Sequence, residues 1–127
     1  WVMPKGANIE AATAFINYLS MPENAVRNMY YIGYTSCIGG QEVFDYLKET
    51  YEAEEGDATA VPYDLSYFFG DTVNGEAVIS APEEQLTRQL FAQYPDAETM
   101  NRCVAMKYFE ADANSRANKM WLEVLAS

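Results

Sequence analysis

Five segments of this chain repeat apolar residues with the spacing of an α-helix, and this pattern is the strongest constraint on its fold. In the first segment, Asn8 is placed to cap a helix N-terminus, because its side-chain oxygen can accept a bond from a free backbone N–H. The apolar residues after it fall on one helical face. They are Ile9, Ala12, Phe15, Ile16 and Leu19. The sequence therefore predicts an amphipathic helix that begins after Asn8.

A second predicted helix has a signal at each end. Ser20-Met21-Pro22-Glu23 has the spacing of a capping box, with proline in the first turn where its missing N–H costs little. Gly33 is a natural C-terminal cap because glycine readily adopts the left-handed conformation. Three residues between these ends are predicted to point inward. They are Val26, Met29 and Tyr30.

A third amphipathic run follows Gly39-Gly40 and ends in the acidic segment Glu52–Asp57. Its apolar face consists of Val43, Phe44, Leu47 and Tyr51. The acidic segment does not have the alternating oxygen ligands and closing glutamate of a calcium loop. It is therefore predicted to be a solvated loop.

From Pro62 the period of the sequence changes to that of a strand. Tyr63, Leu65, Tyr67 and Phe69 occupy alternate positions, as in a strand with one buried face. Asn74-Gly75 then separates this run from the apolar Ala77-Val78-Ile79. Since Asn-Gly favours the tight turn of a hairpin, the sequence predicts a β-hairpin over Tyr63–Ile79.

The segment after the hairpin is predicted to return to helix. Ser80-Ala81-Pro82-Glu83 repeats the capping-box spacing, and Leu86, Leu90 and Phe91 are predicted to point inward. Pro95 ends this helix, and a shorter turn is expected to follow.

The last predicted helix runs from about Asn114 to Ala126. Its apolar stripe has regular helical spacing, which favours packing in a core over a cofactor site. The stripe consists of Ala117, Met120, Trp121, Val124 and Leu125. With 127 residues, half of them hydrophobic, the chain is long enough for one compact domain over residues 1–127. The predicted fold is mainly α with a small β-hairpin.

Composition excludes several classes of function. The chain has no histidine, which rules out Ser-His-Asp and Cys-His catalysis and imidazole metal sites. A formal net charge of −11 argues against binding to nucleic acids or anionic membranes. No apolar run approaches the ~20 residues of a membrane span, so no direct membrane insertion is expected. Two cysteines cannot form a zinc site alone. Cys37 and Cys103 could form one disulfide in an oxidising compartment, but two buried free thiols are the favoured prediction.

The remaining polar residues give no local support for an enzyme. Glu83 and Glu84 fall in a predicted first helical turn, where the helix dipole stabilises negative charge. Asp64 and Asp71 flank an aromatic run, but their spacing does not bring them together against a nucleophile. Gly39-Gly40 lacks the lysine of a phosphate-binding loop. The sequence predicts no enzyme activity, no cofactor and no metal site.

The junction after Gly33 has two interpretations. In the first, Gly33 ends the helix and Tyr34 packs over that end. In the second, Tyr34, Thr35 and Ser36 face a cleft and bind a ligand. The second interpretation favours a cationic ligand, because a tyrosine ring attracts an ammonium group by about 0.5–2 kcal/mol.

Five short motifs occur in an order and spacing that resemble one family. They are Pro4-Lys5-Gly6-Ala7, the segment Ala14–Leu19 (AFINYL), Pro22-Glu23-Asn24-Ala25, Ile32-Gly33-Tyr34 and Tyr94–Glu98 (YPDAE). With the closing Met120-Trp121 helix, they resemble the C-terminal part of bacterial spermidine/putrescine-binding proteins. These are the extracellular solute receptors of ABC polyamine importers. The resemblance spans nearly all of the chain.

The resemblance implies a two-lobed, periplasmic-binding-protein-like α/β fold, with the ligand between the lobes. The chain would be a C-terminal fragment of it, with Trp1–Pro4 leaving a hinge strand. Tyr34 matches a ligand-contacting tyrosine of the family. Met106 aligns with a position that is often a polar contact, and methionine cannot replace an amide's hydrogen bond. The selective carboxylates, including a Trp-x-Asp element, would lie upstream. The Pro62–Ser80 region resembles an insertion relative to shorter members.

By this resemblance the chain is expected to be the substrate-binding component of an ABC importer. Its expected partners are a polyamine or other small cationic solute and the permease subunits of the transporter. Its expected location is extracellular or periplasmic, held at the membrane through the parent protein or the transporter. The residues themselves leave an alternative open. An acidic surface rich in tyrosine also suits a protein-interaction module with no small-molecule ligand.

Overall fold

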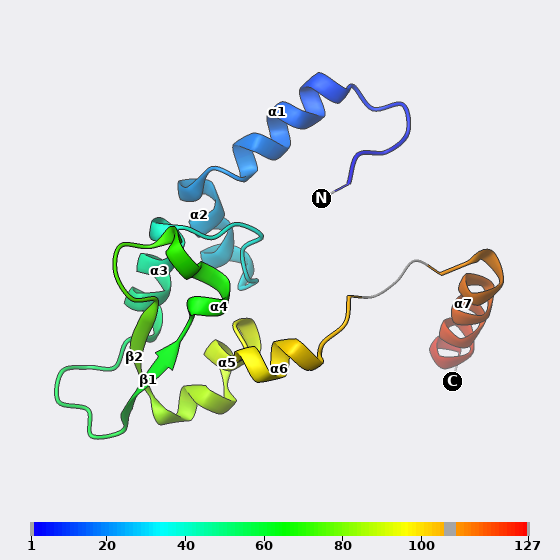
Figure 1. Ribbon diagram of the computed structural model, residues 1–127. Coiled ribbons are helices and arrows are strands. Elements are labelled where there is room, and N and C mark those ends of the chain that lie inside the picture. Colours follow the sequence, from blue (N-terminus) through cyan, green and yellow to red (C-terminus); the bar gives the residue numbers. More distant parts are fainter. Residues whose placement is uncertain (1, 106–108, 127) are drawn as a thin grey trace.

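The computed structural model describes residues 2–105 and 109–126 (Figure 1). Helices account for 58% of these residues, and two strands form a small antiparallel sheet, so the mainly helical prediction is confirmed. In chain order the elements are α1 (Ile9–Leu19), α2 (Pro22–Ile32), α3 (Gln41–Tyr51), β1 (Ala60–Asp64), α4 (Ser66–Phe69), η1 (Gly70–Thr72), β2 (Val78–Pro82), η2 (Glu83–Thr87), α5 (Gln89–Gln93), α6 (Ala97–Arg102) and α7 (Ala111–Leu125).

The first two helices lie where the sequence predicts them. Asn8 caps α1, with its Oδ1 accepting a hydrogen bond from the Ala11 N–H at 3.0 Å. The left-handed Gly33, at φ 72°, ends α2. The prediction of a capping box at Ser20 is wrong, because Ser20 ends α1 and its N–H donates hydrogen bonds to carbonyls of that helix. Met21 takes the N-cap position of α2 without a side-chain bond, and Pro22 starts the helix.

The core lies between α2, α3, the sheet, α4 and α5. The largest fully buried side chains come from α3, from the connection between the two strands, from β2 and from α5. They are Val43, Leu47, Leu65, Ile79 and Leu90. The predicted apolar face of α3 is confirmed, since Phe44 is also buried and Tyr51 packs partly buried against the same cluster. In α2, Met29 is buried and Val26 half-buried, but the prediction for Tyr30 is wrong because it is 75% exposed.

The two strands pair antiparallel, from Ala60 opposite Pro82 to Asp64 opposite Val78. The predicted strand beyond Asp64 is wrong, because residues 66–69 form helix α4. The Asp64 carboxylate accepts a hydrogen bond from the Ser66 N–H at 2.8 Å and so starts a turn. Leu65 and Phe69 lie one helical turn apart and are both buried, while Tyr67 between them is exposed. The alternation of apolar residues over so short a segment is therefore compatible with a single helical turn as well as with a strand.

Asn74-Gly75 is not a two-residue hairpin turn, because residues 65–77 connect the strands. The Asn74 N–H instead donates to Gln41 Oε1 at 2.7 Å, which ties this connection to the start of α3. Gly75 has a φ of 96°, as expected of a glycine in a sharp turn. The predicted hairpin is thus an antiparallel pair joined by a long folded connection.

The helix predicted after Ser80 is broken into two short pieces. Ser80 pairs with Pro62 in the sheet and does not cap a helix. A 3-10 turn, η2, comes first, and the chain then bends at Arg88, with φ −118° and ψ −141°, before α5. Leu90 is buried as predicted and Phe91 is half-buried, but Leu86 is 39% exposed, contrary to the prediction.

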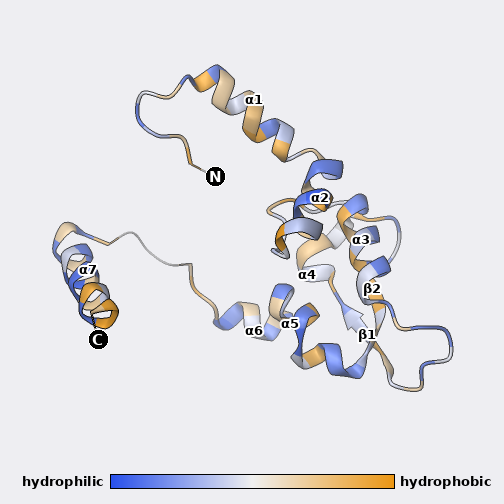
Figure 2. Cartoon of the chain, turned by 180° about the vertical axis from the view of Figure 1, so that it is seen from behind, coloured by the Kyte–Doolittle hydropathy of each residue, from blue (hydrophilic) through white to orange (hydrophobic). Residues whose placement is uncertain are grey.

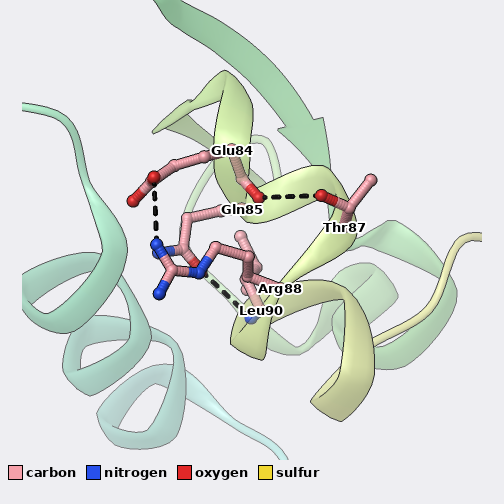
Figure 3. A network of polar contacts seen from close by, with 5 residues as sticks. All are labelled: Glu84, Gln85, Thr87, Arg88 and Leu90. Carbon is pink, nitrogen blue, oxygen red and sulfur yellow. Dashed lines mark hydrogen bonds and ion pairs between the residues drawn. The ribbon is translucent and has the colours of Figure 1, made fainter.

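Polar contacts hold this bend in place (Figure 3). Arg88 Nη1 lies 3.0 Å from Glu84 Oε2, and the Thr87 hydroxyl donates to the Glu84 carbonyl at 3.3 Å. Gln85 Oε1 accepts a hydrogen bond from the Leu90 N–H at 3.3 Å, across the break. The side chain of Gln85 therefore provides a partner for the first turn of α5 that no capping residue supplies.

The predicted turn after Pro95 is a helix. Asp96 caps α6 by accepting a hydrogen bond from the Thr99 N–H at 2.7 Å. Hydrogen bonds from Thr99 hold the pKa of the Asp96 carboxyl below its usual range. Since Asp is a favoured N-cap, the signal was present in the sequence.

The outer helices, α1 and α7, project away from the core elements (Figures 1 and 2). Neither helix contains a buried residue. Helix α7 begins at Ala111, slightly before the predicted Asn114. The prediction that its apolar stripe packs in a core is wrong in this chain, because Trp121 is 60% and Leu125 79% exposed. Met106, Tyr108 and Trp1 lie outside the described residues, and residues 2–4 form no strand. No helix in the described part of the chain has the length and apolarity to cross a membrane.

Candidate functional site

The candidate site is the loop that joins α2 to α3. It begins at Gly33 and ends at Gly40, and both glycines have positive φ, at 72° and 112°. These conformations let the backbone leave one helix and enter the next sharply, because neither glycine has a Cβ to clash. Since α2 and α3 both contribute to the core, the two ends of the loop are fixed by packing.

Tyr34, Thr35 and Ser36 all line one pocket of about 270 Å³ beside this loop. The other walls come from the end of α1, from α2 and from the rest of the loop. They are Leu19, Ser20, Ala25, Asn28, Met29, Ile32, Cys37 and Ile38. The ring of Tyr34 stays 77% exposed, so it does not pack tightly over the end of α2. The structure thus places the three predicted residues together around one hollow.

The hydroxyl groups of Thr35 and Ser36 each make one hydrogen bond within the protein. Ser36 Oγ accepts a hydrogen bond from the Ile38 N–H at 3.1 Å, which leaves its own hydrogen available to a ligand. The Thr35 hydroxyl donates to the Gln93 carbonyl at 3.3 Å, which leaves its oxygen able to accept a bond. The Tyr34 hydroxyl makes no hydrogen bond to any residue that the structure describes.

Gln93 holds the loop against the rest of the molecule. Its Nε2 donates to the Gly33 carbonyl at 3.2 Å, and its Oε1 accepts a bond from the Tyr51 hydroxyl at 3.3 Å. With the Thr35 bond to its backbone, this one residue at the end of α5 joins the ends of α2 and α3. Nothing in the local sequence marks Gln93, because all its partners are far away along the chain.

Tyr94 follows Gln93 and belongs to the core. It is 3% exposed, and its ring packs against Phe68 and Phe69 with centroids 5.3 and 5.9 Å away. Burial, with the neighbouring Tyr51 and Tyr46, raises the pKa of Tyr94 to about 12. Its hydroxyl has no hydrogen-bond partner among the described residues, while its carbonyl accepts the Tyr63 hydroxyl at 2.7 Å. Tyr94 therefore supports the site without facing it.

The pocket is uncharged. None of its lining residues is an acid or a base, and most of its wall is apolar. It can hold an alkyl segment, offer the face of Tyr34 to an ammonium group and give hydroxyl contacts. It cannot neutralise a cation with a carboxylate of its own.

The cysteines do not change this chemistry. Cys37 and Cys103 are free, as predicted, but both are exposed, so the prediction that they are buried is wrong. Within the described residues, no group of three or more Cys, Asp or Glu side chains is arranged to hold a metal ion.

No protein-family model, curated protein or solved structure matches this chain. The resemblance to polyamine-binding proteins therefore stays a prediction based on its five motifs. The geometry of the loop after α2 provides the physical argument for a function.

Proposed function

We propose that this chain is the C-terminal part of the substrate-binding component of an ABC importer. In this proposal the loop after α2 forms one wall of a cleft that receives a polyamine. The parent protein works outside the cytoplasmic membrane and delivers the solute to permease subunits. A two-lobed receptor of the periplasmic-binding type supplies the opposite wall.

The exposed ring of Tyr34 beside a pocket is the observation that carries this proposal. Gly33 and the Gln93 side chain fix the backbone just before Tyr34, so its ring is presented from a rigid position. A flexible polyamine loses less binding energy when the protein groups that meet it are already in place. Thr35 Oγ1 is an acceptor for an ammonium hydrogen at the same rim.

The absence of a carboxylate in the lining sets a limit on what this chain does alone. An ammonium group needs compensation by negative charge when it leaves water. The pocket provides aromatic and hydroxyl contacts only, so the carboxylates of the cleft belong to the other wall. The 127-residue chain is therefore expected to show no micromolar binding of spermidine or putrescine.

The test is calorimetric titration of spermidine and putrescine into the parent receptor and its Tyr34→Ala variant. Loss of one aromatic face should weaken binding by about 1–2 kcal/mol, or roughly five- to thirty-fold. Tyr67→Ala is the matched control, because Tyr67 is an exposed tyrosine that does not line the pocket. If Tyr34→Ala melts at a lower temperature and still binds polyamine normally, Tyr34 only packs at the end of α2.

A second candidate function is favoured by the outer helices. Exposed apolar side chains on α1 and α7, such as Ile9 and Leu122, suit an acidic protein-interaction module. The two candidates differ in one result. A parent receptor that binds no small cation, while this chain still forms a stoichiometric protein complex, supports the module and contradicts the importer.

A further inference from the structure

A second hollow lies between α2 and α3, away from the loop residues discussed above. It has a volume of about 500 Å³ and is called here the tyrosine groove. Its lining residues are Val26, Arg27, Tyr30, Tyr31, Tyr46, Glu49 and Thr50. None of them lines the pocket beside Tyr34. The two hollows are therefore separate surfaces.

The aromatic rings of the groove are open to solvent. Tyr30 is 75% and Tyr31 84% exposed, and their rings meet edge to face with centroids 5.7 Å apart. Tyr46, from the neighbouring helix, is half-buried at the base. The hydroxyls of these three tyrosines make no hydrogen bond within the described part of the chain. Exposed aromatic rings around a hollow, with unused hydroxyls, are typical of binding surfaces.

The groove lining holds one acid and one base, and the surface around it is acidic. Glu49 makes no ion pair with a described residue, whereas its neighbour Lys48 is paired with Glu52 at 3.6 Å. Arg27 is the one base in the lining, and it also has no ion pair in the described structure. Asp45 and Glu42 on α3 add negative charge, and the chain as a whole carries −11. A basic segment would thus be attracted over a distance.

We propose that the tyrosine groove binds an arginine side chain of a partner polypeptide. The planar guanidinium stacks on a tyrosine ring, while its N–H groups reach the Glu49 carboxylate and the tyrosine oxygens. Arginine fits this set better than lysine, because its flat, weakly hydrated head can stack and donate several hydrogen bonds at once. The proposal does not depend on the polyamine function, which concerns a different pocket.

The test is an NMR titration of the 127-residue chain with the blocked peptide acetyl-Gly-Arg-Gly-amide. The aromatic signals of Tyr30, Tyr31 and Tyr46 report on the groove, and those of Tyr34 report on the other pocket. We expect saturable shifts at the three groove tyrosines, with a Kd on the order of 1 mM for one side chain. The same peptide with citrulline in place of arginine is uncharged but similar in shape, and it should bind about five-fold more weakly or worse.

Two variants sharpen the result. Glu49→Gln should weaken binding of the arginine peptide by about two- to five-fold, because it removes the unpaired carboxylate. Arg27→Gln should strengthen binding by a similar factor, because it removes a like charge from the groove wall. Glu55→Gln, in the exposed acidic loop, is the matched control and should change the Kd by less than either. All three positions are exposed, so the chain should remain folded.

Several outcomes would overturn the proposal. Equal binding of the arginine and citrulline peptides would show that charge is not recognised. An unchanged Kd in Glu49→Gln would remove the carboxylate from the site. Putrescine that shifts the groove tyrosines as strongly as the arginine peptide would assign the groove to free amines. By contrast, loss of polyamine binding by the parent receptor would leave the groove result unaffected.

Discussion

Helices α3 and α7 are built from the same kind of amphipathic pattern but meet different surroundings. In α3, the apolar face is buried, with Val43 and Leu47 fully inaccessible. In α7, no residue is buried, and Trp121 and Leu125 are largely exposed. Periodicity therefore predicted both helices, but it did not predict whether a partner surface would cover them. Helical pattern and burial are separate properties of a segment.

The largest expected effect separates these two helices by stability. Leu47→Ala should destabilise the chain by about 2–5 kcal/mol, because it opens a cavity in a packed core. Leu125→Ala should stay within about 0.5 kcal/mol, because its side chain is already in water. Urea denaturation followed by tyrosine fluorescence measures both. A comparable loss in Leu125→Ala would mean that α7 is packed in solution.

The second comparison lies within the core, between two tyrosine hydroxyls. Tyr63→Phe should cost about 1–2 kcal/mol, because it leaves the buried Tyr94 carbonyl without its 2.7 Å bond. Tyr94→Phe should be neutral or stabilising, because that hydroxyl is buried without a partner in the described structure. Thermal and urea unfolding of both variants would test the pair. Equal losses would show that the Tyr94 hydroxyl has a bond partner in solution.

A third experiment isolates α1 from the core. Asn8→Ala removes the N-cap bond to Ala11 and should weaken α1 by about 1 kcal/mol. Since α1 contains no buried residue, the loss should remain local. Hydrogen exchange should show faster exchange in α1 and unchanged protection in α3. Slower folding or lower protection throughout the chain would contradict this independence.

The smallest effect is a pH dependence at α6. Hydrogen bonds from Thr99 lower the pKa of Asp96, so the folded state favours the ionised form. The stability that this bond provides is present above the ordinary carboxyl pKa and is lost as the pH falls through the lowered value. The protection factor of the Thr99 amide, taken relative to its intrinsic exchange rate at each pH, should therefore fall in acid. Asp96→Asn keeps an N-cap side chain but removes the titrating carboxyl. In this variant the protection of the Thr99 amide should not depend on pH in this way.

The candidate site could be predicted only in part. Tyr34, Thr35 and Ser36 are consecutive residues after a helix-ending glycine. They could be predicted as site candidates because Gly33 marks the end of the helix just before them. Gln93 could not be found in the same way, because it contacts Gly33, Thr35 and Tyr51 from a distant helix. Local patterns do not encode contacts between residues that are far apart along the chain.

The errors between Asp64 and Arg88 have the same origin. Leu65 and Phe69 fit a strand and a single helical turn equally well, and packing against the core selected the turn. Ser80 has the side chain of a helix cap, but its backbone pairs with Pro62. Propensity is weak over a few residues, so tertiary contacts decide short elements.

Local chemistry determined the start of α1 and both ends of α2. Asn8, Pro22 and Gly33 act through backbone groups within one turn, so their effects are the same in any fold that contains these segments. Tertiary structure decided which apolar faces are buried, where the strands stop and which distant residues support the loop after α2. Those outcomes depend on which apolar surfaces meet in the folded chain. The hydrophobic effect favours burial of apolar area but has no directional preference, so the local sequence does not specify the partner surface.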